Sequence, residues 1–251
     1  MSTIKGLLSD YGGTLDTGGD HWGKVLWHGY ERARVPVSEE QFRQAYVHAE
    51  RTLATQPLVT PQTTFRSLLG MKIGIELRYL TEQGVWHASD DEVEERRSAI
   101  LEDLYGRVCE RTSHSGRVLS ALSESYPIVL VTNFYGNIST VLHEFGLDGF
   151  FTGIVESAVA GVRKPDPKIF TLGVERLGIS PDKVMAIGDS YSKDIVPATA
   201  AGCHTAWLRG EEWLPEKNVP GVASTVISDL SELKGILSSE QRFKDNTKSK
   251  A

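Results

Sequence analysis

The chain has 251 residues, of which 40% are hydrophobic, and a formal net charge of −6 at pH 7. This length suits one large domain or two small ones, and the apolar content is enough for a sizeable core. The acidic balance argues against nucleic acid or an anionic membrane surface as a partner, because binding to either favours an excess of Lys and Arg.

The cysteines and the N-terminal residues bear on location. Cys109 and Cys203 have no metal-ligand spacing, which favours two free thiols in a reducing compartment. The first residues show no apolar stretch behind a basic region, and no run reaches the ~20 apolar residues of a membrane span. We therefore expect a cytoplasmic protein. The sequence carries no signal for its oligomeric state.

A short apolar run at residues 4–8 predicts a buried strand, and Asp10 follows it. Gly12 and Gly13 come next, and glycine permits the sharp turn that this position needs. An acid at the carboxyl end of a buried strand, followed by a glycine-rich turn, is a common ligand site in α/β sheets. Taken alone, Asp10 could equally serve only to open a turn.

Residues 21–122 show helical patterns and no convincing buried strand. The expected helices cover residues 22–30, 38–54, 64–81, 90–109 and 115–123. Ser38 and Gln41 have the Ser-x-x-Gln spacing of a capping box, which predicts that a helix begins there.

Strand and helix patterns alternate along the rest of the chain. Expected strands cover residues 128–131, 151–156, 184–187, 204–208 and 224–227, and expected helices cover residues 136–145, 166–177, 195–201 and 230–237. The alternation predicts an α/β protein with a Rossmann-like, doubly wound parallel sheet. The expected domains are an α/β core of residues 1–16 and 115–238, an inserted all-helical cap of residues 17–114, and a disordered or frayed tail of residues 239–251.

Polar residues follow three of the expected strands, and one lysine precedes a helix. They are Asp10, Thr132, Asn133, Lys164, Asp189 and Asp194. Parallel strands bring such ends together, where clustered carboxylates repel one another unless a cation is present. Mg²⁺ prefers a few carboxylates and water, and a lysine with a hydroxyl beside it suits a bound phosphate. An ionised Asp in this setting can attack phosphorus.

These segments together resemble the haloacid dehalogenase superfamily, in the variety that has a helical cap after the first strand. The matching segments are residues 10–16, 131–133, 164–167 and 188–194, in the family's order. The resemblance implies that Asp10 is the nucleophile of a hydrolase that acts on a small phosphorylated metabolite. It also implies a Mg²⁺ ion held by Asp10, the Gly12 carbonyl and Asp189, with Asp194 near the metal or orienting Lys164.

The resemblance assigns the remaining site residues to the phosphoryl group. Thr132 and Lys164 are expected to hold its oxygens and assist catalysis, and Gly13 and Asn133 are expected to bind substrate beside them. Gly12 departs from the family pattern, because phosphatases of this superfamily carry a second Asp there as general acid and base. Loss of such a group typically costs ~10²–10⁴ in rate.

Three alternatives remain open at this stage. Another group, such as His21, His28 or Glu31, could move the proton in place of the missing Asp. The chain could instead cleave a carbon–phosphorus or carbon–halogen bond; the phosphonate-cleaving members use a cap lysine, and Lys24 and Lys72 are the only cap lysines. It could also be a phospho-ligand binder or regulatory protein without useful turnover.

Overall fold

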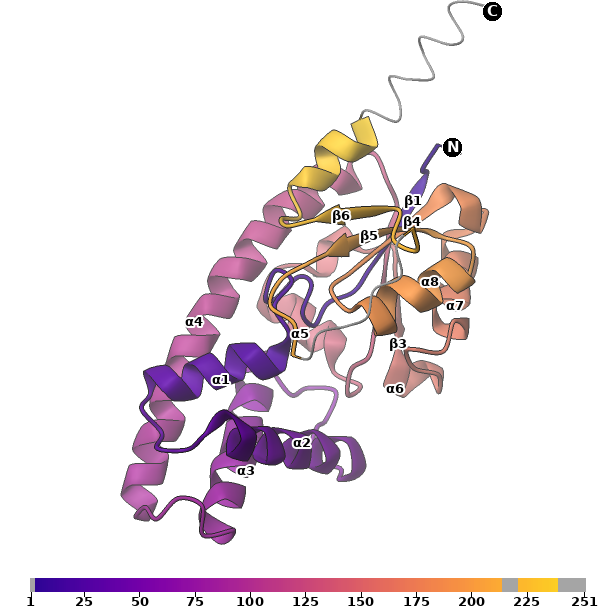
Figure 1. Ribbon diagram of the computed structural model, residues 1–251. Coiled ribbons are helices and arrows are strands. Elements are labelled where there is room, and N and C mark those ends of the chain that lie inside the picture. The colour runs from indigo at the N-terminus through magenta and orange to yellow at the C-terminus, as the bar shows by residue number, and fades with distance from the viewer. Residues whose placement is uncertain (1–2, 214–220, 239–251) are drawn as a thin grey trace, which may run out of the picture.

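The computed structural model describes residues 3–213 and 221–238, and the tail expected at residues 239–251 lies outside them. The chain has two parts, a parallel sheet flanked by helices and a bundle of helices beside it (Figure 1). This arrangement confirms the predicted α/β class with a helical cap.

Six parallel strands form the sheet, in the order β3-β2-β1-β4-β5-β6. Their bounds are Gly6–Ser9 for β1, Ile128–Thr132 for β2, Gly153–Glu156 for β3, Val184–Gly188 for β4, His204–Leu208 for β5 and Thr225–Ile227 for β6. The first strand lies between β2 and β4, so the strand order reverses beside it. In open α/β sheets this switch point is where ligands bind.

Both faces of the sheet are buried, because successive side chains of each strand point to opposite sides. Leu7 packs into one apolar cluster and Leu8 into another. Helices α7 (Lys168–Leu177) and α8 (Val196–Ala200) cover the Leu8 side, while α5 (Ile138–Glu144) and the end of α4 (Asp90–Ser123) cover the Leu7 side.

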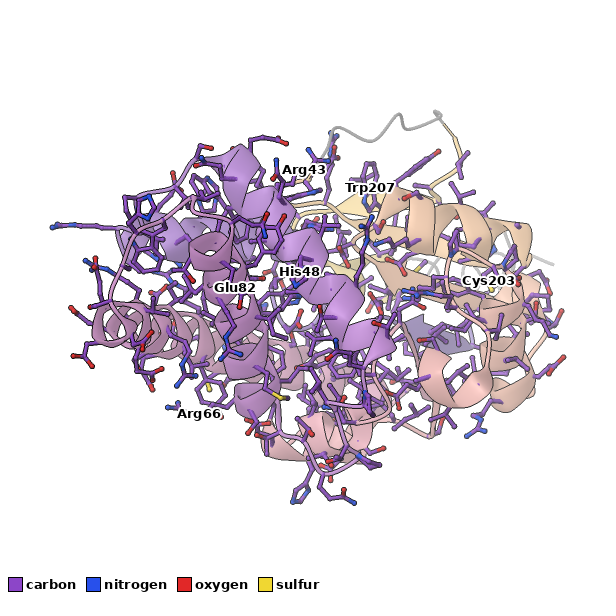
Figure 2. The ribbon with its side chains drawn as sticks, turned by 90° about the horizontal axis from the view of Figure 1, so that it is seen from below. Arg43, His48, Arg66, Glu82, Cys203 and Trp207 are labelled. Carbon is purple, nitrogen blue, oxygen red and sulfur yellow. The ribbon has the colours of Figure 1, made fainter. Side chains whose placement is uncertain are left out.

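The cap consists of α1 (Trp22–Arg32), α2 (Glu39–Thr55), α3 (Phe65–Glu82) and the first part of α4. Its buried residues, such as Tyr30 and Phe42, belong to the same apolar cluster as the Leu7 face of the sheet. The capping box at the start of α2 is present as predicted. Seen from below, cap and core lie side by side (Figure 2).

Helix α4 differs from the prediction of two separate helices, because it runs unbroken through residues 110–114. It is about 51 Å long and crosses from the cap to the core (Figure 1). Two polar side chains in or next to this stretch bond to backbone carbonyls within the fold. The Thr112 hydroxyl donates to Val108 O at 2.7 Å, and Ser115 donates to Leu15 O at 2.7 Å. The cap boundary expected at residue 114 therefore falls inside one continuous helix.

Several short elements also escaped prediction. These are α6 (Ser157–Ala160), the 3₁₀ turns Asp148–Phe150 and Pro181–Lys183, and a π-helical turn at Tyr191–Ile195. Residues 232–238 are helical, close to the expected last helix. Both cysteines are free, and Cys203 lies in the α/β core (Figure 2). Within the described residues no helix combines the length and apolar character needed to cross a bilayer.

Candidate active site

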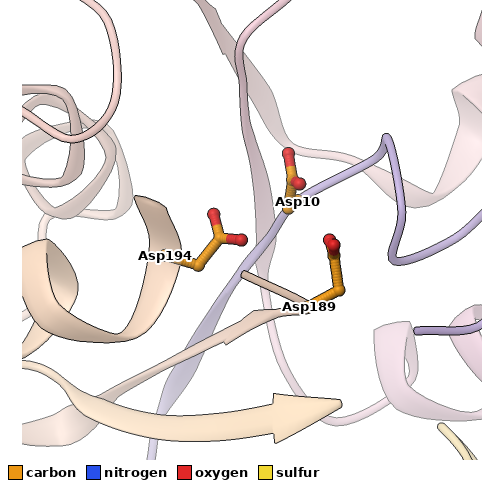
Figure 3. Close-up of side chains that lie close together, drawn as sticks. All are labelled: Asp10, Asp189 and Asp194. Carbon is orange, nitrogen blue, oxygen red and sulfur yellow. The ribbon is translucent and has the colours of Figure 1, made fainter. Parts of the chain in front are cut away.

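Three carboxylates converge at the carboxyl ends of β1 and β4. Asp10 follows β1, Asp189 follows β4, and Asp194 belongs to the π-helical turn. Each offers an oxygen, and these oxygens all lie within 4.8 Å of one another (Figure 3). The cluster lies in a cavity of about 830 Å³ between the sheet and the cap.

Lys164 joins two of these acids. Its Nζ lies 2.7 Å from Asp10 Oδ1 and 2.5 Å from Asp194 Oδ1, and its side chain is only 2% exposed. The Asn133 amide fixes the lysine's backbone, because Asn133 Oδ1 accepts from Lys164 N and Asn133 Nδ2 donates to Lys164 O. The ion pair with Lys164 places Asp194 where it could orient the lysine, one of the two roles expected for it.

The glycine turn after β1 brings Asp189 close to the chain. Gly13 has φ +92°, and a Cβ there would lie 2.4–2.5 Å from the Asp189 carboxylate. Only glycine fits both the left-handed backbone and this contact. Thr14 Oγ1 donates to Asp189 Oδ1 at 2.9 Å, and the Trp207 indole donates to Asp189 O at 2.7 Å. The turn thus holds the second acid in place.

The three carboxylates of the cluster have one lysine, Lys164, to balance their negative charge. Burial, supported by the nearby Asp194, raises the pKa of Asp10 to about 6 even though Lys164 opposes the shift. Burial, Asp194 and Asp10 together raise the pKa of Asp189 well above its usual range. Burial alone would lower the pKa of Lys164, but Asp10 and Asp194 outweigh it and raise that pKa. Three carboxylates with one lysine leave room for a divalent cation.

The donor set fits Mg²⁺, a hard ion that prefers carboxylate oxygens and water. Asp10 and Asp189 would hold it, and Asp194, already bound to Lys164 through Oδ1, lies beside them. The second oxygen of Asp194 accepts from Ser190 N at 3.0 Å. The carboxylates of Asp10 and Asp189 are therefore the better placed pair for the ion.

All the expected site residues line this one cavity. They are Asp10, Gly12, Gly13, Thr132, Asn133, Lys164, Asp189 and Asp194. Thr132 is 1% exposed, and its hydroxyl makes no hydrogen bond within the described part of the chain. Such a hydroxyl can donate to a bound anion. The individual roles of these residues stay predictions.

Of the three alternative proton carriers, only His21 reaches the cavity. Its Nδ1 accepts from Gly23 N at 3.0 Å, which assigns the ring proton to Nε2. Burial, with smaller effects of Lys193 and Lys72, lowers the pKa of His21 to about 4. His28 instead pairs with Glu31 and Glu211 outside this cavity.

The sequence analysis missed several residues that line the cavity. Tyr46 and Glu50 from α2 and Tyr135 from the core also line the cavity. Lys72, considered only as a possible covalent lysine, lies there and pairs with Glu50, whereas Lys24 pairs with Glu39 elsewhere. Tyr46 and Glu50 are one helical turn apart, so their shared face was readable, but the partner on another helix was not.

The fold and the carboxylate–lysine cluster are those of an α/β enzyme with an aspartate at the switch point of its sheet. The sequence profile of the haloacid dehalogenase-like hydrolases matches residues 4–202, and the chain belongs to this family. The pyrimidine 5'-nucleotidase YjjG of Escherichia coli is 31% identical over 134 residues, which are 52% of this chain and 58% of that protein.

A glyceraldehyde 3-phosphate phosphatase of Methanothermobacter thermautotrophicus is 33% identical over 99 residues, 38% of this chain and 44% of that protein. The chain thus spans about half the length of the curated relatives it matches. The structure of the HAD-hydrolase YfnB from Bacillus subtilis, solved with bound magnesium, has a TM-score of 0.59 at 22% identity, covering 94% of this chain and 99% of that one. This likeness shows the shared fold.

Proposed function

We propose that the protein is a Mg²⁺-dependent hydrolase of a small phosphate monoester and works through an aspartyl-phosphate on Asp10. The main support for this proposal is the cluster of Asp10, Asp189 and Asp194 around Lys164 in one cavity. The activities of the phosphatase and nucleotidase relatives support a phosphate ester as substrate.

The proposed chemistry uses the residues at the strand ends. A carboxylate oxygen of Asp10 forms a bond to phosphorus, the bond to the ester oxygen breaks, and water later releases phosphate from Asp10. Lys164 and the Thr132 hydroxyl hold the phosphoryl oxygens in place for this attack. A bound Mg²⁺ supplies positive charge that keeps Asp10 ionised and offsets charge on the phosphoryl group.

The missing acid at Gly12 makes turnover of alkyl esters slow in this proposal. The departing alkoxide needs a proton, and His21 is a poor acid because its pKa of about 4 leaves it neutral at pH 7. The proton then comes from solvent. Esters with a good leaving group avoid this step and should react faster.

The cap lysines weigh against a phosphonate-cleaving enzyme. A Schiff base needs a neutral amine, but the pKa of Lys72 lies well above its usual range: burial lowers it, and Glu50 more than restores it. Halide release needs no metal, whereas the acid cluster favours one. The binder without turnover differs from the proposal only in activity, so a rate measurement decides between them.

Phosphate release from a panel of phosphate monoesters tests the proposal. We expect release in Mg²⁺, none in chelator, and a loss of at least about 10³-fold in Asp10→Asn, since the amide cannot act as the nucleophile. A folded protein that binds phosphate analogues but releases no phosphate from any ester would instead be a binder.

A further inference from the structure

The charged residues that line the cavity form two groups, one mainly acidic and one mainly basic. The carboxylates of Asp10, Asp189 and Asp194 gather at the strand ends, and Asp16 is occupied by Gly13 N and the Trp22 indole. Apart from Lys164, which pairs with Asp10 and Asp194, the remaining charged residues are here called the cap-side wall. They are Glu50, Arg51 and Lys72 of the cap, and Arg163 and Lys193 of the core. Four cations and one carboxylate give this wall a formal charge of +3.

Lys72 is the most enclosed cation of the cap-side wall. Its side chain is 11% exposed, and its Nζ lies 4.8 Å from the centre of the Tyr46 ring. An ammonium group has three N–H donors, yet Glu50 is its one ion-pair partner among the described residues. Lys72 therefore keeps donor capacity beside the cavity, where it can form a charge-assisted hydrogen bond with a bound anion.

Glu50 does not cancel the charge of the wall. It is 37% exposed at its side chain, and the Tyr135 hydroxyl donates to it from the core at 3.2 Å. Burial would raise the pKa of Glu50, but Lys72 and more distantly Lys193 outweigh burial and lower it. The carboxylate is thus shared among several donors.

Apolar side chains also line the cavity. Leu53, Val59 and Leu69 line the same cavity, which at about 830 Å³ holds far more than a phosphate group. The strand-end cluster takes the phosphoryl group under the proposed function. The cap-side wall then faces whatever the phosphate is attached to.

We propose that the cap-side wall selects phosphate esters that carry a second anionic group, such as a carboxylate, on a partly apolar body, and that Lys72 is the specificity-determining residue that binds this group. The proposal rests on the function proposed above, because it assumes that the phosphoryl group occupies the strand ends. An amine-bearing ester is the opposite case, since only Glu50 could bind it.

Binding of phosphonates, which cannot be hydrolysed as esters, tests the inference without turnover. We would measure by calorimetry, with Mg²⁺, the Kd of benzylphosphonate, 4-carboxybenzylphosphonate and 4-(aminomethyl)benzylphosphonate. A shorter pair, propylphosphonate and 3-phosphonopropionate, covers a different reach. The carboxylate should tighten Kd about tenfold in at least one pair, as expected for one charge-assisted hydrogen bond.

Three variants assign the effect to Lys72. Lys72→Met should abolish the carboxylate preference and leave the Kd of the neutral phosphonates within about twofold. Lys24→Met is the matched control, because Lys24 is a cap lysine that pairs with Glu39 at 2.6 Å outside the cavity; it should keep the preference. Glu50→Gln should strengthen the preference for the carboxylate, and its amide oxygen still accepts from Tyr135. This variant therefore tests the inference even if Lys72→Met does not fold.

The outcomes separate this inference from the proposed function. Equal Kd values for neutral and carboxylated phosphonates, tighter binding of the amine, or a carboxylate preference unchanged by Lys72→Met and by Glu50→Gln would overturn the inference alone. A carboxylate preference without phosphate release from any ester would overturn only the hydrolase. No binding of any phosphonate would overturn the inference, and phosphate release from the esters would still decide the proposed function.

Discussion

A side chain at residue 12 would enter open space in the cavity. A Cβ built on Gly12 meets nothing within 4 Å, and its φ lies outside the left-handed region, unlike that of Gly13. Gly12→Asp can therefore be made without strain. It would place a carboxyl where phosphatases of the family carry their general acid and base.

The magnitude follows from what proton transfer is worth. General acid–base catalysis contributes about 10²–10⁴ in rate, or ~3–5 kcal/mol of barrier. For an alkyl phosphate, kcat/KM of Gly12→Asp should rise by at least about 10²-fold, because the alkoxide now receives a proton. For 4-nitrophenyl phosphate, whose phenolate leaves unaided, kcat/KM should change less than about fivefold.

Gly12→Asn is the matched control, since it has nearly the same shape and cannot exchange a proton. Phosphate release by both variants and the parent would be followed on the two esters. An equal gain in Asn and Asp, or no gain on the alkyl ester in a folded Asp variant, would refute the reasoning. In the second case another group of the chain already supplies the proton.

Two further predictions concern stability. Gly13→Ala should lower the unfolding temperature more than Gly84→Ala, because Gly84 has φ +67° with open space while Gly13 also meets Asp189; equal losses would contradict this contact. Burial raises the pKa of Glu76 from 4.5 to about 8. As pH rises through this range, Glu76 loses its proton in the unfolded chain but keeps it in the folded chain, so the free energy of unfolding falls. The free energy of unfolding of the parent, measured in urea, should fall by up to about 5 kcal/mol between pH 4.5 and 8 relative to that of Glu76→Gln. A difference between the two proteins that stays constant with pH would disprove the shift.

The strand-end site was predictable because the pattern that reveals it lies along the chain. Each buried run is followed by its own polar residue, and parallel packing carries Asp10, Thr132 and Asp189 to one edge of the sheet. The motif order also placed Lys164 near Asp194, and the two form an ion pair. Local pattern and global topology agree here, so the sequence was sufficient to bring these residues together, while their roles stay predictions.

The cap-side wall was not predictable in the same way. Lys72 and Glu50 lie on different helices, and their pairing depends on how α2 and α3 pack, which no spacing along one helix records. The unbroken α4 escaped for a related reason. The Ser115 hydroxyl bonds Leu15 O, a partner 100 residues away, so its tolerance within the helix is a tertiary effect.

The central claim is that Asp10 becomes phosphorylated during turnover. The protein would be mixed with 4-nitrophenyl phosphate and Mg²⁺, quenched in acid and digested, and the peptide that contains residue 10 analysed by mass spectrometry. Because Gly12 offers no base to hydrolyse the acyl phosphate, the account predicts a phosphoryl group on Asp10 that accumulates in the parent and is absent from Asp10→Asn. Phosphate release with no adduct, or with the adduct on another residue, would contradict it.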